Sequence, residues 1–415
     1  MIPRLVVLID NELVGHLWLD DKKRFCFQYM RTWIEKSKIP LSLSLPLRND
    51  PYMDDESHAF FANLLPEQKI REVVARNLGV SPQNDFALLE KIGGDCAGAV
   101  SLYPEGVEFP ERDKAYKKIT ASELKEIIQR LPQRPLLAGE AGFRLSLAGA
   151  QKKLPVFFDE NVFYLTYGGA PSNYIIKPPI EGLDGTVENE SFCMVLAREI
   201  GLDVPSSFIY TLEDLSVYVI RRYDRSTTKD GIARLHQEDF CQALNIPPEY
   251  KYESEGGPGL VQCFKLVRDR SVRAGKDVSS LLNWVIFNYL IGNSDAHAKN
   301  ISLLLLPQGP VLAPFYDLLS TRIYGHLGLA EGLAMKIGGE SDHGAIQRKH
   351  WEALAEELNI RPKFVISRVI EIVKKIQAIR LRLFKEFSDS YKCDALYRLN
   401  ELICDSSDKA IRRLS

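Results

Sequence analysis

Acidic and amide side chains follow two apolar segments in the second half of the chain. Asp295 and Asn300 come after an apolar stretch that ends at Gly292, and Asp317 comes after a second one, residues 311–316. Carboxylate and amide oxygens are suitable ligands for Mg²⁺, and a carboxylate can also take the proton of an attacking hydroxyl group. These residue types in this order predict a phosphoryl-transfer centre.

The spacing of Asp295 and Asn300 is the D-x-x-x-x-N of a protein kinase, in which the Asp is the catalytic base and the Asn binds Mg²⁺. The flanking H-R-D and D-F-G sequences are absent. Asp and Asn are also common in loops because they tolerate turn geometry, so the spacing alone is a weak indication. A kinase additionally needs a phosphate-binding loop and a lysine on a strand.

Regular elements must position these side chains. Residues 281–292 form an apolar helix that we expect to end at Gly292, so that Asp295 and Asn300 fall in the loop after it. A strand is expected over 301–306, and a second strand over 311–316 would end on Asp317.

Two earlier segments could bind phosphate. Residues 144–153 are rich in small residues and end in two lysines, which lets backbone N–H groups approach phosphate oxygens. Residues 174–177 are an apolar run that closes on Lys177, and Glu190 in the next helix is a candidate partner for that lysine. An ordinary turn and a lysine at a strand end are the simpler explanations of these two features.

Length and composition narrow the protein class. The chain has 415 residues, 45% apolar and 26% charged, which is typical of a globular protein with two or three domains or lobes. Its net charge of −2 gives no overall reason to expect nucleic-acid or membrane binding. No apolar stretch reaches the roughly 20 residues that span a bilayer. Asp10 and Glu12 stand where a signal peptide would be apolar.

The seven cysteines are scattered, with no C-x-x-C pair, which favours reduced thiols in a cytosol over disulfides or a zinc site. A basic cluster on the long helix near the C-terminus is most simply a solvated face, and contact with nucleic acid or an acidic partner is the alternative. The cluster consists of Lys374, Lys375, Arg380, Arg382 and Lys385.

The order of elements is also predicted. The chain opens with a three-stranded meander over 5–29. Helices follow up to residue 92, and Thr120 to Glu123 form a capping box. Residues 236–239 begin a short helix, and 251–259 form a flexible crossing. Further strands are expected at 154–158, 162–166, 205–212 and 216–223, and C-terminal helices at 347–358, 362–387 and 394–404.

Several separated motifs, taken in order, resemble the HipA family of serine/threonine kinase toxins from bacterial type II toxin–antitoxin operons. The resemblance covers nearly the whole chain. The motifs are residues 40–47 (PLSLSLPL), 60–66 (FFANLLP), 93–100 (GGDCAGAV), 146–153 (SLAGAQKK), 174–178 (YIIKP), 237–239 (QED), 251–259 (KYESEGGPG), 291–300 (IGNSDAHAKN) and 314–317 (PFYD).

The resemblance implies an α+β, two-lobed protein-kinase-like fold of HipA type, with a β-rich N-terminal accessory subdomain and a mostly helical C-terminal lobe. The expected parts are the accessory subdomain (1–110), a linker and helix (111–140), the kinase N-lobe with phosphate loop and adenine hinge (141–245) and the helical C-lobe with catalytic loop and metal site (246–415).

The resemblance also implies roles for individual residues. Asp295 would be the catalytic base, Asn300 and Asp317 the Mg²⁺ ligands, and Ser146 the site of an inactivating autophosphorylation. The implied ATP-binding residues are the phosphate loop Ala148, Gly149, Ala150, Gln151, Lys152 and Lys153, the phosphate-binding Lys177, the adenine hinge Arg221, Arg222 and Tyr223, and His297, Lys299 and Tyr316.

Two positions depart from the family pattern. Lys152 and Arg221 each stand where the best-known pattern has Glu. Arg221 should be tolerated if the hinge binds adenine through backbone groups. Lys152 could alter closure of the phosphate loop.

The expected function is therefore an ATP- and Mg²⁺-dependent protein kinase that arrests growth in the cytoplasm. Its substrate would be a cellular protein, with an aminoacyl-tRNA synthetase as one candidate, and its partner a helix-turn-helix antitoxin through which it reaches DNA. The alternative is a catalytically silent nucleotide-binding corepressor. A small-molecule kinase is disfavoured because the resemblance includes the N-terminal subdomain.

Overall fold

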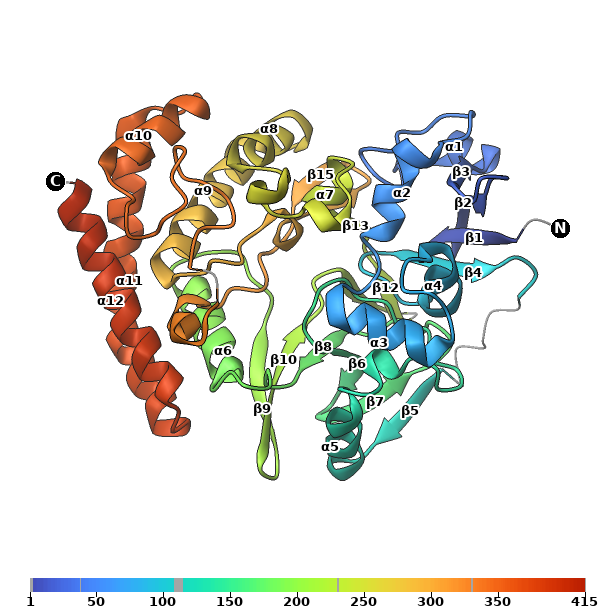
Figure 1. Ribbon diagram of the computed structural model, residues 1–415, viewed down its shortest axis with the longest axis horizontal. Coiled ribbons are helices and arrows are strands. Elements are labelled where there is room, and N and C mark those ends of the chain that lie inside the picture. Colours follow the sequence, from blue (N-terminus) through green and yellow to red (C-terminus); the bar gives the residue numbers. More distant parts are fainter. Residues whose placement is uncertain (1–2, 38, 108–114, 230, 330, 415) are drawn as a thin grey trace. The chain divides into compact units, whose positions relative to one another are not determined.

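The computed structural model describes residues 3–37, 39–107, 115–229, 231–329 and 331–414 (Figure 1). The chain divides into two compact units. The first contains Met1–Pro178, Tyr210–Glu249 and Leu303–Pro310, and the second contains Pro179–Ile209, Tyr250–Ser302 and Val311–Ser415. One unit thus contains both the expected accessory subdomain (1–110) and most of the expected kinase N-lobe (141–245).

The first unit opens with a four-stranded antiparallel sheet in the order β3-β2-β1-β4. The predicted meander is confirmed, and β4 joins it from 70 residues further on, opposite β1. Aliphatic and aromatic side chains of the strands and helices form its buried core, with Phe27, Phe61 and Phe86 among the aromatic ones. The elements are β1 (Arg4–Ile9), β2 (Glu12–Leu19), β3 (Phe25–Tyr29), α1 (Arg31–Lys36), α2 (Asp54–Ala62), α3 (Gln68–Leu78), α4 (Asp85–Ile92) and β4 (Val100–Pro104).

A second sheet has the strand order β5-β7-β6-β8-β10-β9. The predicted capping box is confirmed, because Thr120 accepts the N–H of Glu123 at the start of α5. The elements are β5 (Tyr116–Ile119), α5 (Ala121–Arg130), β6 (Leu154–Asp159), β7 (Val162–Thr166), β8 (Tyr174–Lys177), β9 (Ser207–Leu212) and β10 (Leu215–Arg221), followed by the hairpin of β11 (Arg225–Thr228) and β12 (Gly231–Arg234).

The helix predicted to begin at 236–239 starts later. Gln237–Asp239 is a short strand, β13, and Asp239 caps the following α7 (Phe240–Ala243). Pairing explains the difference, because the N–H of Leu305 in β14 (Ser302–Leu306) donates to the carbonyl of His236 at 2.9 Å. Such a partner, distant in sequence, overrides the local preference for a helix.

The PLSLSLPL motif packs beside this strand. The carboxylate of Glu238 is fully buried and accepts the N–H of Leu43 at 3.0 Å and the hydroxyl of Ser42. His236 Nε2 lies 2.8 Å from the carbonyl oxygen of Leu41. Burial lowers the pKa of His236 to about 4, so this ring is neutral at physiological pH. The motif therefore has a structural role within the first unit.

The second unit is mostly helical, as expected. Its last two helices, α11 and α12, lie side by side (Figure 1). Two residues of the basic cluster form ion pairs with neighbouring helical residues: Lys375 bonds Glu371, and Arg382 bonds Glu199 and Glu386. Arg380 is buried and bonds Asn400, so the solvated-face explanation does not extend to it. The helices are α6 (Thr186–Glu199), α8 (Leu260–Arg270), α9 (Ala274–Ile291), α10 (Arg348–Glu357), α11 (Pro362–Ser390) and α12 (Asp394–Leu414).

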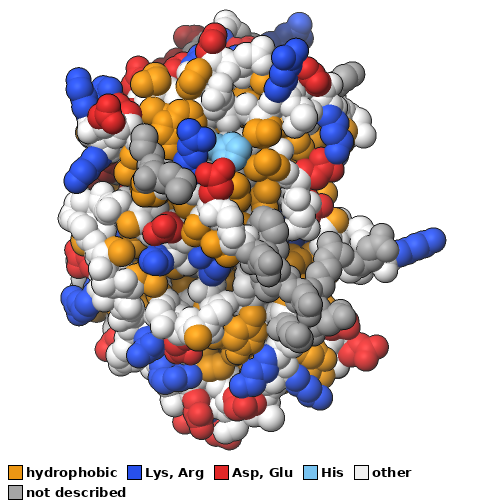
Figure 2. Space-filling model, turned by 90° about the vertical axis from the view of Figure 1, so that its right-hand side faces the viewer, with side chains coloured by type: hydrophobic (Ala, Val, Ile, Leu, Met, Phe, Trp, Pro, Cys, Tyr) orange, Lys and Arg blue, Asp and Glu red, His pale blue; other side chains and the backbone are white. Residues whose placement is uncertain are grey.

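On the face shown in Figure 2, positive, negative and apolar side chains are interspersed, and neither charge dominates. This mixture agrees with the net charge of −2. Within the described residues, no helix is both long and apolar enough to cross a bilayer.

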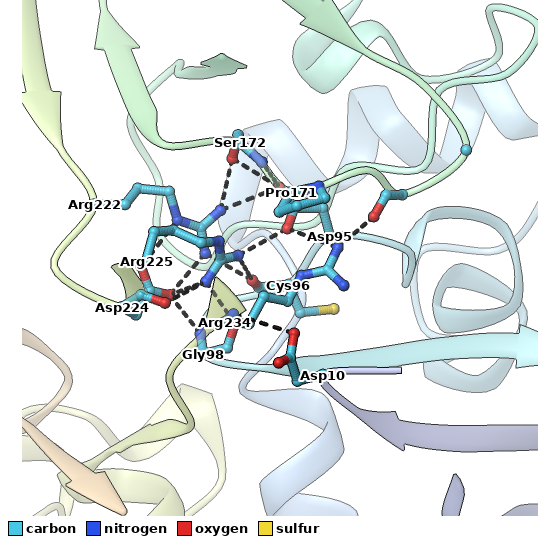
Figure 3. Close-up of polar contacts among 12 residues, drawn as sticks. Asp10, Asp95, Cys96, Gly98, Pro171, Ser172, Arg222, Asp224, Arg225 and Arg234 are labelled. Atoms are coloured by element: carbon cyan, nitrogen blue, oxygen red, sulfur yellow. Dashed lines mark hydrogen bonds and ion pairs between the residues drawn. The ribbon is translucent and has the colours of Figure 1, made fainter. Parts of the chain in front are cut away.

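A buried ion network joins distant parts of the first unit (Figure 3). Asp95, from the GGDCAGAV motif, is fully buried, and its carboxylate contacts Arg222 at 3.2 Å and Arg225 at 2.8 Å. It also accepts the Ser172 hydroxyl at 2.7 Å. Burial by itself would raise the pKa of Asp95, but Arg222, Arg225 and Arg234 outweigh it and hold the pKa at about 2.

A second carboxylate completes the network. Asp224 bonds Arg222 at 2.8 Å and Arg225 at 2.9 Å, and accepts the N–H of Gly98 at 2.7 Å. Because every charged member has a partner of opposite sign, the desolvation of these groups is compensated as long as the set stays complete.

Replacing Asp95 with Asn should destabilise the first unit by about 3–5 kcal/mol, because it leaves buried arginines without their partner. The pKa of Asp95 is lower in the folded chain than its ordinary 3.8. Its contribution is therefore complete above about pH 5 and is lost as the pH falls through the pKa of about 2. Urea unfolding of the wild type and Asp95→Asn at pH 7 and pH 3 measures this contribution to the free energy of unfolding.

The free energy of unfolding should accordingly differ more between the wild type and Asp95→Asn at pH 7 than at pH 3. Asp21→Asn, at an exposed turn, is the matched control and should leave the unfolding midpoint unchanged. An equal loss at both pH values would contradict the assigned role of the Asp95 charge.

Candidate active site

Helix α9 delivers the loop that carries Asp295. It is confirmed as an apolar helix ending before Gly292, although it begins at Ala274, earlier than the predicted 281. Gly292 has φ 69° and ψ 46°, the left-handed conformation in which glycine commonly ends a helix. A Cβ here would lie 3.0 Å from the Leu402 side chain and 3.2 Å from that of Arg322. Only glycine therefore fits this turn without strain.

Asn293 ties the loop to the segment that carries Asp317. Its side-chain oxygen accepts the N–H of Asp295 at 3.1 Å. Its amide nitrogen donates to Asn288 Oδ1 at 2.8 Å and to the Asp317 carbonyl at 3.3 Å. One buried side chain thus holds together the two segments in which the sequence predicted the base and a metal ligand.

Asp295 is accessible and oriented. Its side chain is 47% exposed, and Oδ1 accepts the phenol O–H of Tyr252 at 2.6 Å. The Nε2 of His297 lies 3.8 Å from the same oxygen. Asn300 donates its amide N–H to the Asp295 carbonyl at 2.9 Å, which closes the loop. The structure thus brings Asp295, His297 and Asn300 together.

The strand predicted over 311–316 is wrong beyond its first part. β15 covers Gly309–Leu312 and ends well before Asp317. Pro314 has no N–H to continue a ladder, and the N–H of Phe315 donates instead to the Asp203 carbonyl at 2.8 Å. Asp317 itself has φ 54°, a conformation that Asp tolerates better than most residues.

Three residues assigned to the nucleotide site have structural contacts in the same loop. Tyr316 donates its hydroxyl to the Lys299 carbonyl at 2.8 Å and lies 2.7 Å from the Ser302 hydroxyl. The side chains of His297 and Lys299 are buried. Their contacts fix the loop conformation, and their part in ATP binding stays a prediction.

The oxygen donors present fit Mg²⁺. Because the amide nitrogen of Asn300 is bonded to the loop backbone, its amide oxygen is the atom suited to a cation, and Asp317 supplies a carboxylate. The described residues contain no group of three or more His, Cys, Asp or Glu able to hold a metal. A kinase site does not require one, because nucleotide phosphates and water complete the coordination of Mg²⁺.

In the first unit, the predicted phosphate loop lies against the turn between α2 and α3. Ser146 is fully buried, donates its hydroxyl to the Leu64 carbonyl at 2.7 Å, and donates its N–H to the Asp95 carbonyl at 3.2 Å. Gly149 has φ 107°, and its carbonyl accepts the N–H of Glu67 at 3.3 Å. The Asp95 network therefore contacts the start of this loop.

The remainder of the loop also has local contacts. Lys153 donates its Nζ to the Ala148 carbonyl, which closes the loop on itself. Ala150, Gln151 and Lys152 are partly or fully exposed.

Lys177 is in β8 as predicted, buried, with its Nζ 5.9 Å from the ring centroid of Tyr218. Glu190 belongs to the other unit, so its pairing with Lys177 stays a prediction.

The Arg222 side chain has a structural role at the predicted adenine hinge. The Arg222 guanidinium is buried in the Asp95 network (Figure 3), and its N–H donates to the Asn173 carbonyl at 2.9 Å. Neither group can therefore bind adenine in this conformation. The Arg222 carbonyl, Arg221 at the exposed end of β10, and Tyr223 stay predictions for the hinge.

Tyr252 is a site residue that the sequence analysis missed. The segment 251–259, expected as a flexible crossing into the second lobe, lies where the chain re-enters the second unit at Tyr250, and it is folded into hydrogen-bonded turns. The Tyr252 carbonyl accepts the N–H groups of Glu255 at 3.0 Å and Gly257 at 2.9 Å. The Glu253 carboxylate accepts the N–H of Lys336 at 2.7 Å. No local signal in this motif indicates a contact with a residue 43 positions later in the chain.

Known proteins resemble this chain over nearly its full length. The family model of the HipA N-terminal domain matches residues 5–103, and that of the HipA-like C-terminal domain matches residues 145–379. The chain is 42% identical to a Sinorhizobium fredii protein named "Putative kinase Y4mE", with 92% of each covered. It is 32% identical to the serine/threonine-protein kinase toxin HipA of Shewanella oneidensis, covering 88% of this chain and 86% of that protein.

A solved structure shows the same fold. In the Shewanella oneidensis complex of HipA, HipB and operator DNA, the similar chain has a TM-score of 0.81 and 27% identity, covering 99% of this chain and 96% of that one. This likeness confirms the expected α+β fold of HipA type.

Two glycines of α9 provide a matched test of how the Asp295 loop is positioned. Gly292→Ala should destabilise the protein by about 1–2 kcal/mol, because alanine disfavours the left-handed conformation. Gly275→Ala, near the start of the same helix, meets no atom within 4 Å and should stabilise by about 0.4–1 kcal/mol. Denaturant unfolding of both variants measures the difference. Equal midpoints would contradict the conformational requirement at Gly292.

Proposed function

This chain belongs to the HipA family, and we propose that it is an ATP- and Mg²⁺-dependent serine/threonine protein kinase acting as the toxin of a toxin–antitoxin pair. The observation that carries the proposal is the hydrogen-bonded system around Asn293. It connects a half-exposed carboxylate, Asp295, with the segment of Asp317, and Asn300 closes the same loop. A base and two oxygen ligands in one rigid system suit transfer of a phosphoryl group to a hydroxyl.

In this proposal Asp295 takes the proton of the acceptor hydroxyl, since its carboxylate is accessible. Asn300 and Asp317 hold Mg²⁺, which when bound would neutralise charge on the nucleotide phosphates. Lys177 and the loop from Ala148 to Lys153 bind the phosphates, and main-chain groups of Arg221, Arg222 and Tyr223 bind adenine. His297, Lys299 and Tyr316 keep the loop around Asp295 in shape.

Burial of Ser146 supports its role as an inactivating site. A phosphate adds about −1.5 to −2 charges. The Ser146 hydroxyl faces the Leu64 carbonyl in a fully buried position, where such a charge would meet an acceptor and no water. A phosphorylated Ser146 would therefore have to leave this position together with the loop that follows. The loop could then no longer bind ATP phosphates.

The proposed partner is a helix-turn-helix antitoxin, through which the chain would reach DNA in the cytoplasm. The support is the likeness to a chain solved together with HipB and operator DNA. The substrate would be a cellular protein, with an aminoacyl-tRNA synthetase as a candidate. The second proposal is a catalytically silent corepressor, whose function would require only contacts with the antitoxin. It is disfavoured by the accessible and oriented Asp295.

Incubation with ATP and Mg²⁺ tests the catalytic proposal. Mass spectrometry of the unmodified wild-type chain should show one phosphate on Ser146, and Asp295→Ala should lower the rate of its appearance by about 10²- to 10⁴-fold, because it removes the base. Asp389→Ala, at an exposed position of α11, is the control and should behave as wild type.

Antitoxin and operator binding should be retained in Asp295→Ala, which separates catalysis from corepression. Unchanged toxicity of that variant would rule out the kinase mechanism. Absence of phosphate from every protein, together with retained operator binding, would favour the corepressor.

A further inference from the structure

We propose that Tyr252 is a positioning residue for Asp295, which fixes one carboxylate oxygen of the base so that the other receives the proton of the acceptor hydroxyl. This inference rests on the proposed kinase function. The observation behind it is the hydrogen bond of 2.6 Å from the Tyr252 phenol to Asp295 Oδ1.

Asp295 needs such a partner because nearly half of its side chain is exposed. An exposed carboxylate rotates among several orientations, whereas a base must be held within a fraction of an ångström of its working position. The Asn293 and Asn300 bonds fix only the backbone of Asp295. Tyr252 bonds its carboxylate, so it can set the orientation of the group that reacts.

Neighbouring groups hold Tyr252 in place, as a positioning residue requires. Its ring meets that of His297 edge to face, with centroids 5.0 Å apart. Its carbonyl accepts two N–H groups in a turn that Gly256 completes with φ 93°. A Cβ on Gly257 would collide with the Tyr250 carbonyl, so this glycine permits the close turn. These contacts keep the phenol directed at Asp295.

The chemistry assigns a different task to each carboxylate oxygen. The acceptor oxygen bonds to the γ-phosphorus of ATP, the bond from that phosphorus to the bridging oxygen breaks, and its electron pair leaves with ADP. The hydroxyl proton passes to Asp295 Oδ2, while Oδ1 keeps the hydrogen bond from Tyr252. The phenol retains its own proton throughout, so Tyr252 acts only through Asp295.

Tyr252→Phe tests this role because it removes the hydroxyl and keeps the ring against His297. Single-turnover phosphate incorporation is followed by intact mass over a range of ATP concentrations. The maximal rate should fall by about 10- to 100-fold, as a loosely positioned base predicts. The ATP concentration at half-maximal rate and the thermal unfolding midpoint should stay unchanged. Tyr250→Phe is the matched control, because this nearby tyrosine is 48% exposed, and should keep the wild-type rate.

A double-mutant cycle gives the second measurement. If Tyr252 acts through Asp295, adding Tyr252→Phe to Asp295→Asn should slow the residual reaction no further. A further loss in the double variant would overturn the proposal, as would a wild-type or faster rate in Tyr252→Phe. A faster rate would indicate that the phenol blocks the acceptor position.

The results of these experiments test the positioning role of Tyr252 separately from the proposed kinase function. An active wild type with an equally active Tyr252→Phe overturns the positioning role and leaves the kinase function standing. An inactive wild type overturns both.

Discussion

The first unit depends on one buried charge, the carboxylate of Asp95. It lies among Arg222, Arg225 and Arg234, and each of those arginines comes from a part of the chain more than 120 residues away. A buried carboxylate without partners would be neutral or would destabilise the fold. Here the arginines keep it ionised, so the buried charge links the GGDCAGAV motif to the segment after β10.

This network also reaches the phosphate loop. Asp95 accepts the N–H of Ser146 through its carbonyl and donates its own N–H to the Arg144 carbonyl. The start of the loop, the strand end at Arg222 and the GGDCAGAV motif are therefore parts of one structure. The N-terminal subdomain therefore contributes Asp95 to the region in which nucleotide binding is proposed.

In the second unit, hydrogen bonds hold the loop around Asp295. Gly292 turns the chain out of α9, Asn293 bonds the backbone of Asp295 and Asp317, and Tyr252 bonds the Asp295 carboxylate. Each hydrogen bond is short-range, yet together they join segments from three separate stretches of the chain. A rigid loop with one exposed carboxylate is the arrangement that catalysis by positioning requires.

Local sequence patterns are sufficient to predict most of the elements and the candidate chemistry. Periodicity located the helices, Gly292 marked the end of α9, and the spacing of Asp295 and Asn300 predicted the loop, because these signals are local. Tertiary structure decided the rest. β13 replaced a helix start through pairing with β14, Asp317 lies beyond a strand that Pro314 ends, Arg222 serves an ion network, and Tyr252 reaches Asp295. Those outcomes depend on partners distant in the chain, and local residue patterns carry no information about which distant groups will meet.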